Sequence, residues 1–154
     1  MMNSKGQETA TFELLVVAIM ALAIMLIVLS ISDYFSSLRF QASEKAFNSA
    51  LKSAVNSPNG AVIIAEGIIL HTGKKTTQLF SNEAAGLEPE CFSIVGPESN
   101  SWQISEEGKT ISILKSVETD VFFQCVLGGD YASTAGSCEE SCRVSFGEDP
   151  EGQA

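Results

Sequence analysis

The hydrophobic pattern changes sharply on both sides of one long apolar stretch. After Glu13, residues 14–32 (LLVVAIMALAIMLIVLSIS) contain no charge, no Pro and no Gly. About 20 helical residues, at about 1.5 Å each, match the ~30 Å hydrocarbon core of a bilayer. Inside that core every backbone N–H and C=O must be paired within the segment, so a single apolar run has to be helical. The pattern predicts a membrane-spanning helix over residues 14–32.

The next residues, 33–56, keep a helical period but become amphipathic. Apolar residues recur every three or four positions in two adjoining stripes. The first stripe is Phe35, Leu38, Ala42, Ala46 and Ala50, and the second is Phe40, Phe47, Leu51, Ala54 and Val55. Pro58 and Gly60 end the pattern. We therefore predict one long helix over residues 7–56, whose first half needs lipid or other helices and whose second half needs a globular partner.

Short apolar or alternating runs separated by turn residues fill residues 61–147. We expect strands at 61–65, 68–72, 76–80, 91–95, 101–105, 110–116, 120–127 and 142–146. Runs of this length and spacing are typical of an antiparallel sheet, and Glu106–Lys109 predicts a hairpin turn. The expected fold class is α+β, with one long N-terminal helix packed through residues ~35–55 on a small antiparallel β-sheet domain. The polar tail, residues 148–154, is expected to be frayed.

All four cysteines, Cys91, Cys125, Cys138 and Cys142, follow the apolar helix. An even number in a small Gly- and Ser-rich region predicts two disulfides formed in an oxidising compartment. Three connectivities are possible, and we favour Cys91–Cys125 across strands with Cys138–Cys142 as a local bridge. The alternative is a four-thiolate zinc site, which the spacing disfavours because only Cys138 and Cys142 form a close pair. Disulfides place the C-terminal part outside the cell, so the N-terminus is predicted to be cytoplasmic.

The charge and the polar residues narrow the possible functions. The formal net charge is -10, which disfavours nucleic acid and anionic surfaces as partners of the C-terminal domain. No catalytic motif is present, so we predict no enzyme, no cofactor and no metal. His71 is expected to be a core or strand-end residue, and Trp102 a core or helix-facing aromatic. Asp130, Glu139 and Glu140 offer carboxylates to calcium, but a solvated loop is the expected outcome.

The first residues of the chain include Lys5-Gly6-Gln7, a few polar residues, then Glu13 and the uncharged helix. This arrangement resembles an archaeal class III signal peptide. Such peptides mark type IV pilin-like proteins, which combine a long N-terminal helix with a small C-terminal β domain. In that family a membrane peptidase cuts after Gly, which implies a leader at residues 1–6 and cleavage between Gly6 and Gln7.

The match to the family motif, Gln-x-Ser/Thr-x-Glu, is incomplete. Thr9 occupies the Ser/Thr position, whereas Thr11 stands where the family has Glu, and Glu13 comes two residues later. By analogy Glu13 pairs with the freed amine of a neighbouring subunit's first residue during assembly. The alternative is a carboxylate that lies in the headgroup layer.

The resemblance implies a filament subunit. Its partners would be other pilin subunits, a prepilin peptidase, an assembly ATPase with its platform protein, and membrane lipid before assembly. The prediction is a single-pass cell-membrane protein that joins a cell-surface filament for adhesion or motility. One alternative is a non-assembling single-pass protein with an extracellular ligand-binding domain. The other is a tethered enzyme with its site in the loop at residues 128–141.

Overall fold

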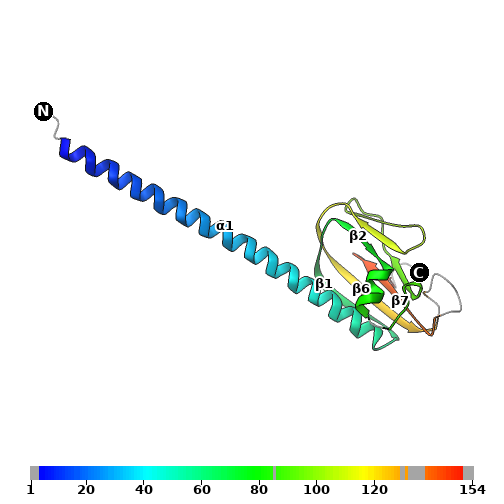
Figure 1. Ribbon diagram of the computed structural model, residues 1–154. Coiled ribbons are helices and arrows are strands. Elements are labelled where there is room, and N and C mark those ends of the chain that lie inside the picture. Colours follow the sequence, from blue (N-terminus) through cyan, green and yellow to red (C-terminus); the bar gives the residue numbers. More distant parts are fainter. Residues whose placement is uncertain (1–3, 85, 129–130, 132–137, 151–154) are drawn as a thin grey trace. The chain divides into compact units, whose positions relative to one another are not determined.

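The computed structural model describes residues 4–84, 86–128, 131 and 138–150, and side chains from residue 11 onward. The chain divides into two compact units, Met1–Phe40 and Gln41–Ala154, and we call the second unit the head. The elements in order are α1 (Ser4–Val55), β1 (Asn59–Leu70), β2 (Gly73–Thr76), α2 (Thr77–Ala84), a short 3-10 helix η1 (Pro89–Cys91), β3 (Phe92–Val95), β4 (Trp102–Ile104), β5 (Thr110–Ile113), β6 (Val117–Leu127) and β7 (Glu140–Phe146) (Figure 1). The predicted α+β class is confirmed.

The described residues of the head form two sheets. The larger has the order β1-β6-β7-β3 and the smaller the order β2-β5-β4. All pairs are antiparallel except β3 with β7, which run parallel, with Phe92 opposite Cys142. The prediction of an antiparallel sheet is therefore correct apart from β3. A parallel pair needs a long crossover, and here the chain passes through β4, β5 and β6 between the two partners.

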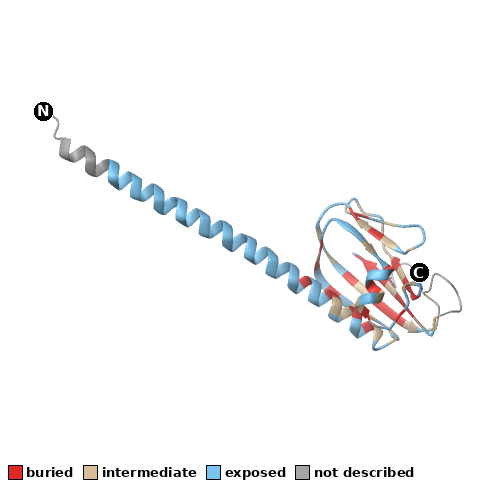
Figure 2. Cartoon of the chain, in the orientation of Figure 1, coloured by how far each residue is buried: buried red, intermediate tan, exposed pale blue. Residues whose placement is uncertain are grey.

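The C-terminal part of α1 supplies one wall of the head's core. Its buried residues within the head are Ser43, Phe47, Leu51 and Ala54, and Figure 2 shows buried positions near the end of α1 that packs on the sheet. The Phe47 ring meets Phe123 of β6 edge-on, with 5.0 Å between ring centroids. These positions repeat every three or four residues, so one face of the helix is buried along its length.

The extent of this packing differs from the prediction. The stripe that contains Phe47, Leu51 and Ala54 is the buried one, whereas Ala42 and Ala46 of the other stripe are exposed. Within the head, the first buried residue of α1 is Ser43, whose hydroxyl accepts a hydrogen bond of 2.7 Å from the Ile69 amide. A polar residue therefore begins the contact, and the pattern of apolar positions gives no signal of it.

One predicted strand is wrong, and two others are parts of a single strand. Residues 76–80 belong largely to helix α2, which buries Thr77, Phe80 and Ala84 with a helical period. The five residues 76–80 are too few to show a helical period, which becomes visible only when the segment is extended to Ala84. The strands at 61–65 and 68–72 are one strand, β1, with a register shift between Ala65 and Ile68. At this bulge Gly67 has a φ of +62° and its amide donates to Asp120 Oδ1 at 2.8 Å.

The start of the C-terminal tail is packed, and not frayed as predicted. The Ser145 hydroxyl donates to the carbonyl of Glu148 at 2.6 Å, and Arg143 donates to the carbonyl of Pro150 at 3.2 Å. Pro150 is also among the fully buried side chains. Arg143 and Ser145 both belong to β7, so these two hydrogen bonds anchor the tail to that strand. Residues 151–154 lie outside the described part of the chain.

The predicted hairpin at Glu106–Lys109 is confirmed between β4 and β5, and its turn also contacts β3. Gly108 lies in this turn with a φ of +63°, and its carbonyl accepts a 2.7 Å hydrogen bond from the Ile94 amide. A Cβ at Gly108 would lie 3.0 Å from the Ile94 carbonyl oxygen. Glycine is needed here both for the left-handed backbone and for the close approach of two main chains.

We expect Gly108→Ala to lower the free energy of unfolding by about 1–3 kcal/mol, because the added methyl must push two backbones apart. Gly67→Ala is the matched control. Its φ is +62° and its nearest neighbour, 3.3 Å away, is the flexible Glu118 carboxylate. Denaturant unfolding of both variants in detergent measures the difference, and equal losses would mean that contact with Ile94 adds nothing to the backbone strain.

Candidate functional site

Helix α1 presents a large apolar surface. From Thr11 onward it is long and apolar enough to cross a membrane, and none of its most apolar window is buried in the protein. The large apolar side chains between Phe12 and Ile31 are exposed, from 38% at Val16 to 72% at Leu14. Each such side chain gains about 1.5–3 kcal/mol when it moves from water to an apolar environment. This surface needs lipid or other apolar helices around it.

The two residues of the predicted cleavage site lie inside α1. The helix begins at Ser4, so Gly6 and Gln7 have helical backbone, whereas the sequence predicted that Gly6 precedes the helix. No Pro interrupts this segment, and a single Gly costs a helix only about 1 kcal/mol. The side chains of residues 4–10 and all of residues 1–3 lie outside what the structure describes. Cleavage after Gly6 stays a prediction, and it would require the first turns of the helix to unwind.

Glu13 is an exposed acid at the start of the apolar surface. Its neighbours Phe12 and Leu14 are 67% and 72% exposed. A carboxylate among apolar groups inside a membrane is costly unless it is paired or reaches the interface. Its position agrees with either predicted role, pairing with a neighbouring subunit or lying in the headgroup layer, and both stay predictions.

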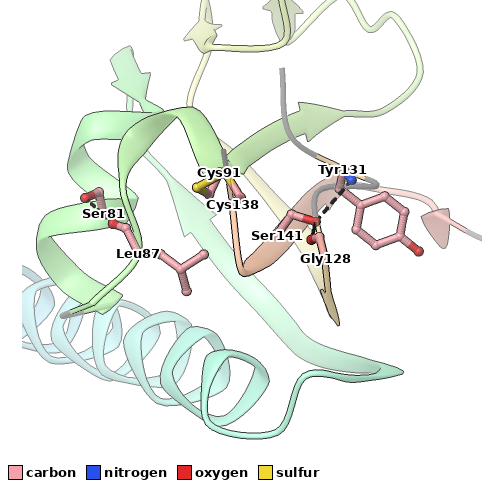
Figure 3. Close-up of a disulfide and its surroundings, with 7 residues drawn as sticks. All are labelled: Ser81, Leu87, Cys91, Gly128, Tyr131, Cys138 and Ser141. Carbon is pink, nitrogen blue, oxygen red and sulfur yellow. Dashed lines mark hydrogen bonds between the residues drawn. A yellow bond between two sulfur atoms is a disulfide. The ribbon is translucent and has the colours of Figure 1, made fainter. Parts of the chain in front are cut away.

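The four cysteines form two disulfides, as predicted, but with different partners. Cys91 is bonded to Cys138 and Cys125 to Cys142 (Figure 3 shows the first), so the favoured pairing, Cys91–Cys125 with Cys138–Cys142, is wrong. Cys125 and Cys142 face each other across the β6–β7 ladder, with Cα atoms 4.1 Å apart. That register leaves Cys138, just before β7, to reach Cys91 beside the parallel strand β3. All four cysteines are described and none is free, so they offer no thiolate to zinc.

Hydrogen bonds hold the ends of β6 and β7 near these disulfides. The buried Ser141 hydroxyl donates to the Gly128 carbonyl at 2.7 Å and accepts from the Tyr131 amide at 3.1 Å (Figure 3). The Tyr131 ring in turn lies 4.2 Å from the guanidinium carbon of Arg143. The sequence gives no signal for Ser141, because a serine in a Gly- and Ser-rich segment is not expected to be buried.

The acidic residues beside the disulfides do not make a metal site with them. Carboxylate and sulfur atoms of Glu140, Cys125 and Cys142 lie within 4.8 Å of one another, but the two sulfurs are bonded together. Glu139 is exposed, and Asp130 lies outside the described residues. In the described part of the chain, Glu140 Oε1 is buried and has no hydrogen-bond partner. Desolvation by this burial raises the pKa of the Glu140 carboxyl.

The raised pKa of Glu140 predicts a pH-dependent stability. Below the unfolded-state pKa of about 4.5 the carboxyl is neutral in both states and burial carries little penalty. As the pH rises through the higher folded-state pKa, the folded protein must lose a proton that it held more tightly than the unfolded chain. The stability of the folded protein therefore falls between the unfolded-state pKa and the folded-state pKa, and it stays lower at higher pH.

We expect Glu140→Gln to raise the melting temperature at neutral pH, with the gain shrinking as the pH falls through the folded-state pKa and little gain left below about 4.5. Glu139→Gln is the matched control, because it makes the same charge change at the exposed neighbouring position. Thermal unfolding of both variants across this pH range measures the effect. A pH-dependent gain of the same size from Glu139→Gln would show that net charge, and not the buried oxygen, is the cause.

His71 and Trp102 have the structural positions predicted for them. His71 is exposed and directly follows β1. Trp102 is 7% exposed in the core cluster, and its indole N–H donates to the Pro97 carbonyl at 3.2 Å. A buried indole with a satisfied N–H is a typical core residue.

Comparison with known proteins gives no relative: no protein-family model, no curated protein and no solved structure matches the chain. The function must therefore be inferred from the exposed apolar helix and the disulfide-bonded head.

Proposed function

We propose that this chain is a type IV pilin-like structural subunit. It is exported, anchored by α1, trimmed after Gly6 by a prepilin peptidase and assembled through its N-terminal helix into a cell-surface filament for adhesion or motility. One observation carries the proposal. A single helix, α1, exposes apolar side chains from Phe12 to Ile31, and its last turns are built into the core of a disulfide-bonded head.

An apolar helix of this length has two possible environments. In a bilayer its side chains contact lipid tails, and outside a bilayer they must contact other apolar surfaces, since each CH₂ left in water costs about 0.8 kcal/mol. Copies of the same helix supply such a surface. The small residues Ala18, Ala21 and Ala23 permit close helix approach, and the larger apolar residues that would pack around them are Val16, Ile19, Met20, Ile24 and Ile27.

This proposal also assigns an orientation and a set of partners. The disulfides of the head require an oxidising compartment, so the head is extracellular and the N-terminus cytoplasmic. The chain itself has a structural, non-catalytic role, and an assembly ATPase with its platform protein supplies the work of extraction from lipid. Glu13 either pairs with the free amine of Gln7 on the next subunit or lies in the headgroup layer before assembly.

Mass spectrometry of the protein purified from its own membranes, and from filaments sheared off the cells, tests the proposal. We expect the mature chain to begin at Gln7. Gly6→Leu should retain residues 1–6 and disappear from the sheared fraction, because a narrow protease subsite accepts only a small residue. Gly6→Ala is the matched control and should be cut at least in part. An intact N-terminus in the wild type, with no protein in the sheared fraction, would favour a non-assembling single-pass protein.

A further inference from the structure

Two aromatic side chains mark the C-terminal end of the apolar part of α1. Tyr34 and Phe35 are 63% and 59% exposed, so the protein's own core does not hold them. Their rings lie edge to face, with centroids 6.4 Å apart. They directly follow Asp33, the first charged residue after Glu13. An exposed aromatic pair at the point where charge returns indicates a contact outside the chain.

The distance from this aromatic pair to the other end of the apolar run matches the thickness of a bilayer's hydrocarbon core. From Phe12 to Tyr34 the helix advances 22 residues, or about 33 Å at about 1.5 Å per residue, close to the ~30 Å hydrocarbon thickness. Tyr and Trp side chains concentrate at both membrane–water interfaces because each combines an apolar ring with a polar group. Tyr34 meets this condition with its ring and its phenol hydroxyl.

The helix surface beneath Tyr34 is suited to an acyl chain. Tyr34, Ile31, Ile27 and Leu26 line a shallow recess together with Ser30. The Ser30 hydroxyl donates to the Leu26 carbonyl at 2.9 Å, so its polar group is satisfied within the helix. The recess is therefore mainly apolar, and the Tyr34 phenol lies at its C-terminal end. Close packing of a second helix favours small residues, whereas most residues here are large.

We propose that Tyr34 and Phe35 form an interfacial anchor that binds the headgroup layer on the outer side of the membrane. The phenol of Tyr34 lies among the headgroups, and a phospholipid acyl chain lies against Leu26, Ile27 and Ile31. This proposal rests on the membrane insertion assumed in the proposed function, but it does not depend on cleavage after Gly6 or on filament assembly. The anchor fixes the depth of α1, because a shift along the helix axis would move aromatic rings into water or Asp33 into hydrocarbon.

Tryptophan depth measurements test the position. Full-length Tyr34→Trp and, as matched control, Leu26→Trp are placed in phosphatidylcholine vesicles whose acyl chains carry bromine either near the glycerol or near the methyl end. The wild type, with Trp102 alone, supplies the background. We expect bromine near the glycerol to quench Tyr34→Trp roughly twofold more than bromine near the methyl end, and the order to reverse for Leu26→Trp. Equal quenching of Tyr34→Trp by both lipids, or none, would overturn the proposal.

A second comparison tests whether the aromatic pair holds the depth. Leu26→Trp is combined with Tyr34→Ser and Phe35→Ser, and the quenching order is measured again. We expect the excess quenching of Leu26→Trp by bromine near the methyl end to become smaller, since the helix is then free to move along its axis. An unchanged profile would show that the pair lies at the interface without anchoring it. Unprocessed protein that never enters a filament gives the same result in vesicles, so failure of the filament proposal and failure of the anchor are distinguishable.

Discussion

Replacing Phe47 by Ala is expected to lower the free energy of unfolding of the head by about 3–5 kcal/mol. Phe47 is 8% exposed, and its ring lies between Phe80 and Phe123, with centroids 5.6 and 5.0 Å away. Removing it leaves a cavity where α1, α2 and the four-stranded sheet meet, and these elements cannot all move inward to fill it. A domain of this size has about 5–15 kcal/mol of stability in total, so the loss is a large part of the whole.

Guanidinium unfolding of the full-length protein in detergent, followed by near-ultraviolet circular dichroism, measures this loss. Leu127→Ala is the control, because Leu127 lies on β6 with Phe123 but is 72% exposed. We expect the control to change stability by no more than about 0.5 kcal/mol. If Phe47→Ala unfolded at the same denaturant concentration as the control, the last turns of α1 would not belong to the head's core.

Removing the Cys91–Cys138 disulfide, with both cysteines replaced by Ala, is expected to cost about 4 kcal/mol, against about 3 kcal/mol for the Cys125–Cys142 disulfide. The bridges span 47 and 17 residues, and the longer loop restricts the unfolded chain more. Cys91–Cys138 also connects the residue before β3 to the residues before β7, two segments that are far apart in sequence.

Each double-alanine variant is the control for the other, because the two changes remove the same number of sulfurs. Non-reducing peptide mapping first establishes that the remaining bridge is intact in each variant, and equilibrium unfolding then ranks them. The opposite ranking would mean that packing of the fully buried Cys125–Cys142 bridge outweighs the restriction of the unfolded chain. In either case, reduced wild type should be less stable than both variants.

Sequence patterns predicted what depends on neighbouring residues. The uncharged run at 14–32 predicted the apolar helix, and the period of Phe47, Leu51 and Ala54 predicted its packed face. The turn at Glu106–Lys109 predicted a hairpin. Each of these signals lies within a few residues of the structure it specifies, because helix periods and turns are local. The presence of two disulfides also followed from cysteine number and position.

Tertiary structure alone decided what depends on distant residues. The pairing of the cysteines follows from the β6–β7 register and from the parallel pairing of β3 with β7. Neither can be read from the residues that neighbour a cysteine in the sequence. Ser43 begins the helix–sheet contact, and Ser145 and Arg143 bind the tail, because the backbone groups that pair with them are brought there by the fold. A pattern of apolar positions predicts that the polar residues between them are exposed. Which of them become buried depends on hydrogen-bond partners that only the folded chain supplies.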